Sequence, residues 1–460
     1  MSSLWDFLAP SGAKSGAVFH GPTASVAISE LAVGSTFGTA LESFRGRSLL
    51  IATHEQLTTA LALIELDGVA RRIVLCTPDL TREHMESIAA TAQADAIVHD
   101  AISATMSVAR LDSHVVTPRP KQGSIRRHAT GATEWILLTS GTTGVPKLVV
   151  HTLHSLAGGL TALPPVGGKS IWSTFYDIRR YGGLQIFLRA VLSGSALVLS
   201  SSGEPTRDFL ARAASAGVTH ISGTPSHWRR VLMSGEASTL DPRYVRLSGE
   251  VADQTVLDNL RAIYPNARIA HAFASTEAGV AFDVNDGIAG FPESFLGVRS
   301  GDIELKIVED TLRIRSGRTA ARYLGGPEPE TLASDDGYVD TGDMVELVGG
   351  RYYFRGRRGG VINVGGLKVY PEEVESVLNA DPRVRMSLVH ARRNPITGSV
   401  VVADVVLANP GSTVTPDTAD SVRIELLAAC RGRLAAHKVP AILRFVPALD
   451  FTASGKLVRP

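Results

Sequence analysis

The sequence has few cysteines, no excess of charge of either sign and no long apolar run. Two cysteines, Cys76 and Cys430, are too few in 460 residues for a disulfide framework or a structural zinc site. Lysine and arginine number 46 and the acidic residues 45, so the net charge of +1 gives no field that would attract nucleic acid or a membrane surface. No stretch reaches the ~18 apolar residues of a membrane-spanning helix, and residues 1–10 lack the basic start and apolar core of a secretory signal. We therefore expect a cytoplasmic globular protein.

Short apolar segments alternate with amphipathic ones over the first 285 residues. The strand-like segments are 48–53, 71–76, 135–140, 147–152, 195–200 and 218–223. Residues 54–66 and 206–217 have apolar side chains at helical spacing. Strands alternating with helices predict α/β layers.

The pattern changes after about residue 285. Residues 301–317, GDIELKIVEDTLRIRSG, predict two alternating strands joined by a Glu-Asp turn, and hence a β-rich subdomain. The glycines and arginines of GRRGG (356–360) indicate a linker, and Pro371 starts a predicted helix. The remaining residues, roughly 100 of them, are enough for a separate α+β domain.

A loop rich in hydroxyls lies between two of the apolar segments. It reads TSGTTGVPK (139–147). Its glycines let backbone N–H groups converge on an anion, its hydroxyls add donors, and Lys147 adds a positive charge. It is not a Walker A loop, because Pro146 precedes the lysine and strand-like LVVH follows it. The loop therefore suits a polyphosphate, and the alternative is a plain polar hairpin loop between two strands.

These nine residues resemble the phosphate loop of the adenylate-forming superfamily: acyl- and aryl-CoA ligases, adenylation domains of nonribosomal peptide synthetases, and luciferases. HTLHSL (151–156) is similar to the segment that follows in the family, and further motifs occur in the family's order up to the C-terminus. The resemblance implies a large N-terminal domain, residues 1–357, and a small mobile α+β lid domain, residues 358–460. It also implies that ATP phosphates bind to Thr139, Ser140, Gly141, Thr142, Thr143, Gly144 and Lys147.

Four further motifs resemble nucleotide-binding segments of that family. LSGE (247–250) would wall the adenine pocket with Ser248, Gly249 and Glu250, mainly through their backbone; the alternative is a strand-to-helix turn. In FASTEAG (273–279), Phe273 would pack on adenine, Thr276 would meet the α-phosphate, and Glu277 would hold Mg²⁺, which prefers carboxylate oxygen. Asp343 of YVDTGD would bind the ribose and Arg357 of FRGR the ribose or a phosphate. Ala274 replaces the family's usual glycine.

Four residues beyond Arg357 complete the comparison with the family, three as matches and one as a departure. Gly359 occupies the place where the family usually has a charged hinge residue, and a glycine there still permits rotation. Gly365 and Gly366 would line a tunnel for a phosphopantetheine arm, or else form a simple glycine turn. Lys456 in FTASGKLVR (451–459) matches the catalytic lysine of the family, although lysines near a C-terminus are usually solvated.

The chemistry implied by the resemblance has two steps. A carboxylate attacks the α-phosphate of ATP and gives acyl-AMP and pyrophosphate, and a thiol then displaces AMP. Lys147, Thr276, Glu277 and Lys456 are the predicted catalytic residues, and Mg²⁺ is the predicted metal. The thiol would belong to coenzyme A or to a separate phosphopantetheinyl carrier protein, and the sequence leaves both open.

The acid would bind between residues 173–187 and residues 220–228. Tyr176 takes the place of a histidine found in many acyl-CoA ligases. Asp177 would bind the ammonium of an amino acid or act as a helix N-cap, and we expect Arg179 and Arg180 to face water rather than a second carboxylate. Gly183, Gly223 and Ser226 would leave room for a ring. A small aryl or short acyl acid is therefore favoured. An amino acid loaded onto a carrier protein is the alternative, and a non-catalytic nucleotide- or acyl-binding protein ranks last.

Overall fold

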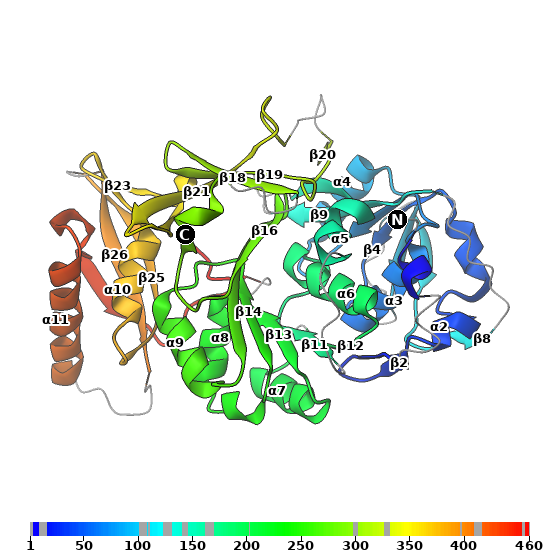
Figure 1. Cartoon of the computed structure of the whole chain (residues 1–460), viewed down its shortest axis with the longest axis horizontal. Coiled ribbons are helices and arrows are strands. Elements are labelled where there is room, and N and C mark those ends of the chain that lie inside the picture. Colours follow the sequence, from blue (N-terminus) through cyan, green and yellow to red (C-terminus); the bar gives the residue numbers. More distant parts are fainter. Residues whose placement is uncertain are drawn as a thin grey trace.

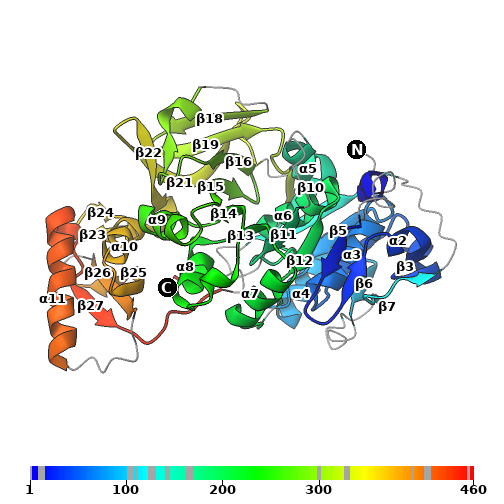
Figure 2. The same ribbon diagram turned by 60° about the horizontal axis from the view of Figure 1, so that its bottom comes forward.

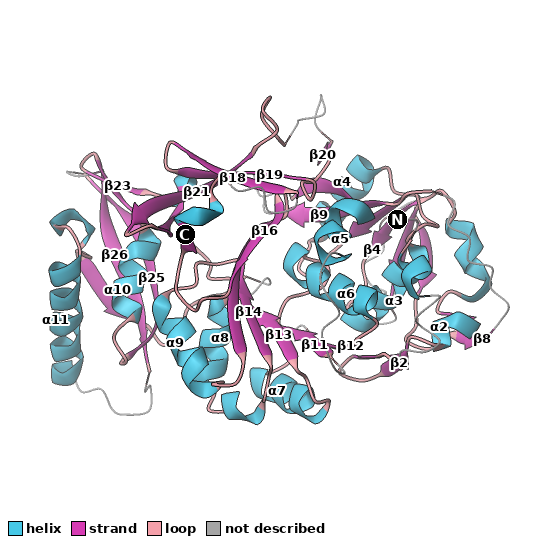
Figure 3. Cartoon of the chain, in the orientation of Figure 1, coloured by secondary structure: helices cyan, strands magenta, loops and turns pink. Residues whose placement is uncertain are grey.

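The structure, a computed structural model, describes residues 3–8, 16–100, 108, 111–122, 131–139, 146–161, 170–201, 203–297, 302–325, 332–395, 398–408, 416–452 and 456–459. Within these ranges, layers of helices and sheets make up most of the molecule, and a smaller unit of helices and strands lies at one end (Figure 1, Figure 3). The predicted fold class is confirmed: a large N-terminal domain of α/β layers with a β-rich part, and a small α+β C-terminal domain.

The first large sheet contains the strands on either side of the predicted phosphate loop. Its members are β4 Ser48–Ile51, β5 Arg72–Leu75, β6 Ala96–His99, β7 Asp112–Val115, β9 Glu134–Thr139, β10 Lys147–Thr152 and β20 Arg322–Leu324. Among the described residues their order is β20-β10-β9-β5-β4-β6-β7. The parallel strands β4, β5 and β6 are buried along their whole length, which explains why their sequences are continuous apolar runs.

The second large sheet brings several strand ends to one edge. Its members are β1 Val18–His20, β2 Ser25–Ala27, β11 Ile171–Thr174, β12 Ala196–Leu199, β13 His220–Gly223, β14 Tyr244–Ser248, β15 Arg268–Ser275 and β16 Gly279–Val284. Within the described ranges the order is β16-β15-β14-β13-β11-β12-β1-β2, and the strands from β12 to β15 are parallel. The carboxyl ends of parallel strands meet at one edge, which is where open α/β sheets bind ligands.

Helices cover both sheets. They are α2 Glu30–Val33, α3 Gln56–Leu66, α4 Arg82–Ala92, α5 Leu153–Thr161, α6 Tyr181–Ser193, α7 Thr206–Ser215, α8 Pro225–Met233 and α9 Gln254–Ile263. Helix α3 is buried at every residue, as expected of a helix that is apolar on all sides. Its Gln56 amide donates to Ser200 O (2.7 Å) and accepts from Ile178 N (2.7 Å). This side chain ties α3 to the ends of strands in the second sheet.

A β-rich subdomain follows, as predicted. Its strands are β17 Phe291–Pro292, β18 Ile303–Val308, β19 Thr311–Ser316, β21 Val339–Val348 and β22 Arg351–Arg357. In the described chain they pair in the order β17-β22-β21-β19-β18. Glu309 and Asp310 join β18 to β19 with φ values of 50° and 57°, the left-handed pair of a tight hairpin turn. The predicted Glu-Asp turn is thereby confirmed. The remaining short elements before this point are β3 Gly34–Ser35, β8 Lys121–Gln122, η1 Gly38–Phe44, η2 Ala237–Thr239 and η3 Glu293–Phe295.

The C-terminal domain begins beyond a short turn, η4 Arg358–Gly360. Its elements are β23 Ile362–Val364, β24 Leu367–Val369, α10 Pro371–Asn379, β25 Val384–Asn394, β26 Gly398–Leu407, α11 Pro416–Arg433, η5 Ala436–Lys438 and β27 Ile442–Phe445. Val374 and Leu378 of α10 pack with Val401 and Leu426 in its own core. After β27 the chain leaves this core and runs back to α8 of the large domain (Figure 2). That return carries Lys456 to the large domain.

Candidate active site

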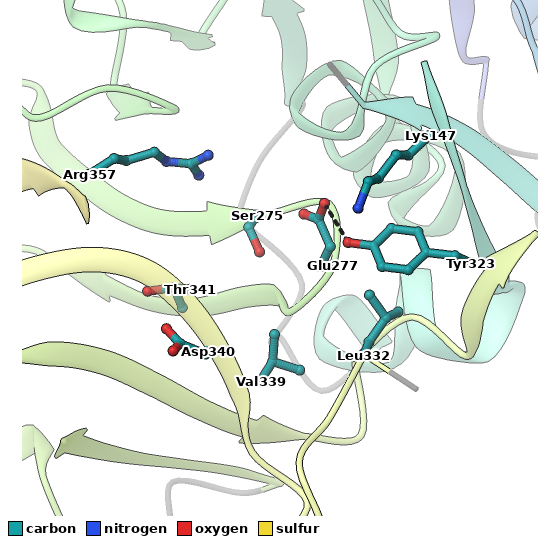
Figure 4. Close-up of a pocket in the computed structure, with 9 residues that line it drawn as sticks. All are labelled: Lys147, Ser275, Glu277, Tyr323, Leu332, Val339, Asp340, Thr341 and Arg357. Carbon is teal, nitrogen blue, oxygen red and sulfur yellow. Dashed lines mark hydrogen bonds between the residues drawn. The ribbon is translucent and has the colours of Figure 1, made fainter. Parts of the chain in front are cut away.

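A cavity of about 380 Å³ lies where the two large sheets meet the β-rich subdomain (Figure 4). Its lining comes from strands that are far apart in the sequence: Lys147, Ser275, Glu277, Tyr323, Leu332, Val339, Asp340, Thr341 and Arg357. Three of these residues, Lys147, Glu277 and Arg357, were predicted from separate motifs. The fold therefore brings predicted phosphate, metal and nucleotide ligands to one place.

The predicted phosphate loop connects two antiparallel strands. Thr139 at the end of β9 pairs with Lys147 at the start of β10. The lysine thus begins a strand rather than a helix, which confirms that the loop is not of the Walker type. Ser140, Gly141, Thr142, Thr143 and Gly144 lie outside the described residues, and their predicted contacts with phosphate stay a prediction.

Tyr323 organises the two charged residues of the cavity. Its ring centroid lies 4.7 Å from the Nζ atom of Lys147, and its hydroxyl donates to Oε1 of Glu277 at 3.4 Å. The side chains of Lys147 and Glu277 both point toward this ring (Figure 4). The sequence did not predict Tyr323, because its position depends on the pairing of the three-residue strand β20 with β10.

His151 connects the strand after the loop to the segment that carries Thr276. Its Nε2 atom donates to Thr276 O at 2.7 Å, so Nδ1 accepts from the Ser155 hydroxyl at 3.0 Å. Burial lowers the pKa of His151 to about 4. The ring is therefore neutral at pH 7 and acts as a structural link, which gives a physical role to the HTLHSL segment.

Asp343 has an oxygen available for a ligand. Its Oδ1 atom accepts from Arg357 Nε at 3.3 Å, while Oδ2 is buried without a hydrogen-bond partner among the described residues. Burial raises the pKa of this carboxyl, and the charge of Arg357 partly offsets the effect. A buried acceptor without a donor is costly. A ribose hydroxyl would supply that donor, which supports the predicted role.

Lys456 reaches the site beside Gly249. Gly249 has a φ of 84°, and a Cβ atom there would lie 3.5 Å from Lys456 Cε and 3.9 Å from Nζ. The left-handed backbone favours glycine and lets the lysine pass close to the chain. Burial lowers the pKa of the Lys456 ammonium, and the charge of Arg357 lowers it further, while Glu250 and Asp343 oppose both. The Lys456 residue as a whole is exposed, but the end of its side chain lies beside Gly249, close to the predicted nucleotide ligands Asp343 and Arg357.

Glu250 contributes its side chain to this region. Oε2 accepts from Ser226 N (3.0 Å) at the start of α8, and Oε1 accepts from Leu457 N (3.3 Å). The sequence predicted a role for its backbone only. The bridging role was not predictable, because it depends on where the C-terminal tail docks.

Phe273, on β15 of the second large sheet, lies in an aromatic cluster between that sheet and the β-rich subdomain. Its ring stacks on Phe354 with centroids 5.2 Å apart and 7° between planes, and it also stacks on Phe282 at 5.9 Å. The cluster fixes the orientation of the ring. Contact between Phe273 and adenine stays a prediction.

The predicted acid pocket begins with a buried tyrosine. The hydroxyl of Tyr176 donates to Ser248 O at 2.7 Å and accepts from Ser248 N at 3.1 Å. Burial raises the pKa of this phenol, so it is neutral. Tyr176 therefore joins the predicted acid pocket to the LSGE segment.

Two expectations for the acid pocket are wrong, because Asp177 and Arg179 bind each other. Oδ1 of Asp177 accepts from Arg179 Nε at 2.7 Å and Oδ2 accepts from Nη2 at 2.6 Å. The Arg179 residue is 1% exposed and also donates to the carbonyl of Thr53. Arg179 thus does not face water. Nor is Asp177 the N-cap of α6, because that position belongs to Arg180. Burial raises the pKa of Asp177, but the Arg179 charge outweighs it and the net shift is downward.

The expectation that Gly183 and Gly223 leave room for a ring is also wrong. A Cβ atom at Gly183 would lie 2.2 Å from Asp177 O, and one at Gly223 would lie 2.8 Å from Cδ2 of Phe175. The chain's own atoms fill the space beside both glycines. Ser226 is buried in the first turn of α8, where its N–H donates to Glu250. These residues shape the pocket by close packing and open no space themselves.

The two glycines predicted to line a tunnel form the turn between β23 and β24. Their φ values are 59° and 90°, and Gly366 N donates to Asn363 Oδ1 at 2.8 Å. A Cβ atom at Gly365 or Gly366 would meet nothing within 4 Å. The turn is therefore open on the side where a side chain would stand. Its contact with a pantetheine arm stays a prediction.

The donors of the cavity fit a magnesium ion held jointly with a nucleotide. No set of three or more His, Cys, Asp or Glu side chains in the described ranges is arranged to hold a metal. Mg²⁺ usually binds to one or two carboxylates together with phosphate oxygens and water. Glu277 is a carboxylate on the cavity wall, so it can take this part.

Both parts of the chain match known families. Residues 49–320 match the family described as AMP-binding enzyme, and residues 373–456 match the one described as AMP-binding enzyme C-terminal domain. None of the helices in the described ranges combines the length and apolar character needed to cross a lipid bilayer.

Similar proteins include two enzymes with the same name. The 2-succinylbenzoate–CoA ligase of Salmonella typhimurium is 29% identical over 287 residues, which cover 60% of this chain and 59% of that enzyme. The chain thus aligns with less than two thirds of that relative's length. The 2-succinylbenzoate–CoA ligase of Geobacillus kaustophilus is 30% identical over 346 residues, or 70% of this chain and 67% of that enzyme. The structure of an anthranilate CoA ligase, AuaEII, in complex with anthranoyl-AMP has the same fold, with a TM-score of 0.79 and 18% identity over 99% of this chain and 95% of that one.

Proposed function

The chain belongs to the AMP-binding enzymes of the adenylate-forming superfamily, and from this premise we propose that it activates a carboxylic acid with ATP and passes the acyl group to a thiol. The acid would react with ATP to give acyl-AMP and pyrophosphate. A thiol would then attack the acyl carbon, and AMP would leave. Coenzyme A is the favoured acceptor, because the two relatives named above are CoA ligases.

The single observation that carries the proposal is the convergence of charge around one site. Lys147, Glu277 and Arg357 line the cavity, and Lys456 and Asp343 adjoin Arg357. These residues come from motifs spread along the chain from residue 147 to residue 456. A protein that only bound an acyl group would not need three cations and a metal-ligand carboxylate at one place.

The residues divide the work of the first step. Lys147 would offset charge on the outer phosphates, and Asp343 would hold the ribose through its free Oδ2 atom. Lys456 would stabilise the charge that develops between the acid oxygen and the α-phosphate, and Thr276 would meet the α-phosphate. Mg²⁺ held by Glu277 would neutralise phosphate charge when bound. Binding the acid and the phosphate in line is the main contribution of the protein.

We propose that residues 1–357 and 358–460 act as separate units. Lys456 adjoins Gly249 of the large unit, so the present arrangement suits formation of the acyl-AMP. For the thiol step the small unit would rotate about Gly359, where a Cβ atom would meet nothing within 4 Å. That rotation would replace Lys456 by the turn of Gly365 and Gly366.

We favour a small aryl acid as the substrate. The three similar proteins named above are called after, or hold, aryl acids: 2-succinylbenzoate in two cases and anthranoyl-AMP in the third. An amino acid is disfavoured, because the Asp177 carboxylate that would bind its ammonium already pairs with Arg179.

The test is a panel of acids in ATP–pyrophosphate exchange. It would contain benzoate, 2-aminobenzoate, 2-succinylbenzoate, short aliphatic acids and the standard amino acids. Exchange with aryl acids, followed by CoA-dependent release of AMP, is the expected result. Exchange with amino acids alone would refute the choice of substrate, and transfer only to a phosphopantetheinyl carrier protein would refute the choice of acceptor. ATP binding without exchange by any acid would point to a non-catalytic protein.

A further inference from the structure

The segment that carries Lys456 docks on helix α8 of the large domain. Residues 450–452 and 456–458 form a small hairpin, in which Phe451 pairs with Leu457 and Val458 N donates to Asp450 O at 3.0 Å. We call the described residues of this segment, 450–452 and 456–459, the lysine tail. Figure 2 shows the chain passing from β27 toward α8, where the C-terminus is marked.

Two contacts join the lysine tail to the large domain. The guanidinium of Arg230 on α8 lies 4.6 Å from the centroid of the Phe451 ring. Leu457 N, one residue after the lysine, donates to Glu250 Oε1 at 3.3 Å, while Glu250 Oε2 accepts from Ser226 N in the first turn of α8. The contact of Phe451 precedes Lys456 in the chain and the contact of Leu457 follows it, so the large domain binds the hairpin on both sides of the lysine.

Within the part of the chain that the structure describes, the Arg230 guanidinium forms no ion pair and no side-chain hydrogen bond, although the charge of Glu250 acts on it. Its Nε atom is buried without a hydrogen-bond partner among the described residues. No carboxylate in the described chain lies within ion-pairing distance of it. The described contact of its guanidinium is the face of Phe451, and a cation over an aromatic face is attracted to it.

A different set of contacts joins the same tail to the small domain. The guanidinium of Arg459 donates to both oxygens of Glu375 on α10, at 2.8 and 2.9 Å, and pairs with Glu372 at 3.2 Å. If the small domain turned, Arg459 would keep these partners and travel with them. The contacts of Arg230 and Glu250 would break.

We infer that α8 and Glu250 form a docking surface for the lysine tail, and that Arg230 and Glu250 are positioning residues for Lys456. The inference rests on the proposed function. It predicts that weakening this surface slows formation of acyl-AMP, which needs Lys456, and spares the thiol step, which does not. It further predicts that, in variants with a weakened docking surface, the small domain spends less time in the present arrangement than it does in the wild type.

The kinetic test uses Arg230 and Phe451, neither of which lies in the proposed ATP or acid site. Arg230→Ala and Phe451→Leu should each lower the kcat of pyrophosphate exchange about threefold to fivefold, the range for one cation–π contact. The double variant should be no slower than either single one, because both remove the same contact. Arg230→Lys should recover most of the rate. Glu250→Gln should lower exchange about tenfold, because one of its two N–H partners is lost.

The thiol step supplies the contrast. CoA-dependent consumption of supplied benzoyl-AMP should stay within about twofold of wild type in Arg230→Ala and Phe451→Leu, since a twofold change is under 0.5 kcal/mol. Arg207→Ala is the matched control, because Arg207 is an exposed arginine on the neighbouring α7 and contacts Glu236. It should change neither half-reaction. Equal loss of both half-reactions in Arg230→Ala, or no loss in either, would overturn the inference.

A measurement of the distance between the two domains tests the docking surface even if the protein activates no acid. Spin labels at Val33→Cys on α2 and Ile424→Cys on α11 would report on the two domains, since these side chains are 61% and 64% exposed and both native cysteines are buried. Arg230→Ala should shrink the population at the wild-type distance and add a second population, and Arg207→Ala should not. An unchanged distribution in Arg230→Ala would overturn the docking surface. Failure of the acid panel alone would overturn only the proposed function.

Discussion

Two arginines and two carboxylates act on the ammonium of Lys456, although the residue as a whole is exposed. Burial and Arg357 lower its pKa, Arg180 lowers it slightly more, and Glu250 and Asp343 raise it. A lysine in such a place is sensitive to what occupies the site, because phosphate oxygens would favour its charged form. Two predictions follow from the charge and position of this one side chain.

Replacement of Lys456 should separate the two half-reactions. Lys456→Ala should lower the kcat of pyrophosphate exchange at least about 100-fold, since it removes a charge that acts in the transition state. Thioester formation from supplied acyl-AMP should stay close to wild type. Lys121→Ala on β8 is the control, because Lys121 is exposed. Exchange that survives in Lys456→Ala would show that the lysine is not catalytic.

The lowered pKa of Lys456 should appear in the pH dependence of the first step. In the proposed mechanism adenylation needs the protonated ammonium of Lys456, so the rate should fall as pH rises through its pKa. Because burial and Arg357 lower that pKa, the alkaline limb of kcat/KM for ATP should lie below the ordinary lysine value of about 10.4. In Lys456→Arg the same limb should move upward or vanish, since arginine keeps its proton. An alkaline limb at the same pH in both proteins would assign it to another group.

At the scale of the element, the start of α6 is held by close packing and by one buried ion pair. Gly183 sits against Asp177 O, and the side chain of Asp177 holds Arg179. This turn fixes the position of Tyr176, which bonds to Ser248 at the end of β14. A change in the first turn of α6 therefore reaches the predicted acid pocket through the backbone.

Two adjacent glycines of α6 should respond in opposite ways to the same substitution. Gly183→Ala places a methyl 2.2 Å from Asp177 O, and overpacking of this kind costs about 1–3 kcal/mol of unfolding free energy. Gly182→Ala is the matched control, since its methyl would lie 3.5 Å from the Tyr176 ring, an ordinary contact. It should be neutral or stabilise by about 0.4–1 kcal/mol. Urea unfolding measures both, and equal stability of the two variants would contradict the packing argument.

At the scale of the whole molecule, buried histidines link stability to pH. Burial lowers the pKa of His151 and His220 to about 4 and that of His227 to about 3, from the usual 6.5. At a pH between these folded-state pKa values and 6.5, the histidines are protonated in the unfolded chain and neutral in the folded chain. Stability is therefore fully present above pH 6.5 and falls as pH drops toward 4.

His151 allows this linkage to be tested at one position. With a pKa of about 4 in the folded state, it should account for about 2 kcal/mol of the stability lost between pH 7 and pH 5. His151→Gln keeps a donor for Thr276 O and cannot titrate, so its loss over this range should be smaller by that amount. His154→Gln, at an exposed position on α5, should lose as much as wild type. Urea unfolding at pH 7 and pH 5 measures the loss of unfolding free energy in each protein. Identical losses in all three proteins would show that His151 does not contribute to the pH dependence of stability.

Much of the fold followed from local pattern. The runs at 48–53, 71–76 and 147–152 became β4, β5 and β10, and the helix predicted at 54–66 became α3. The Glu-Asp turn was predictable because two successive left-handed residues are what a tight hairpin requires. The predicted ends of the first two runs differ from the observed strand ends by one or two residues, because the last residue pairs of a strand depend on the neighbouring strands.

The sequence by itself determined which chemical groups the site would contain. Lys147, Glu277, Asp343, Arg357 and Lys456 stand in motifs whose residue types suit a nucleotide, and short segments of chain suffice to recognise them. Only the tertiary structure decided which groups would be free to act. It paired Asp177 with Arg179, filled the space beside Gly183 and Gly223, and set Tyr323 and Arg230 against partners far away in the chain. The physical reason is that such contacts depend on sheet order and on where the C-terminal segment docks, and neither is encoded in the spacing of neighbouring residues.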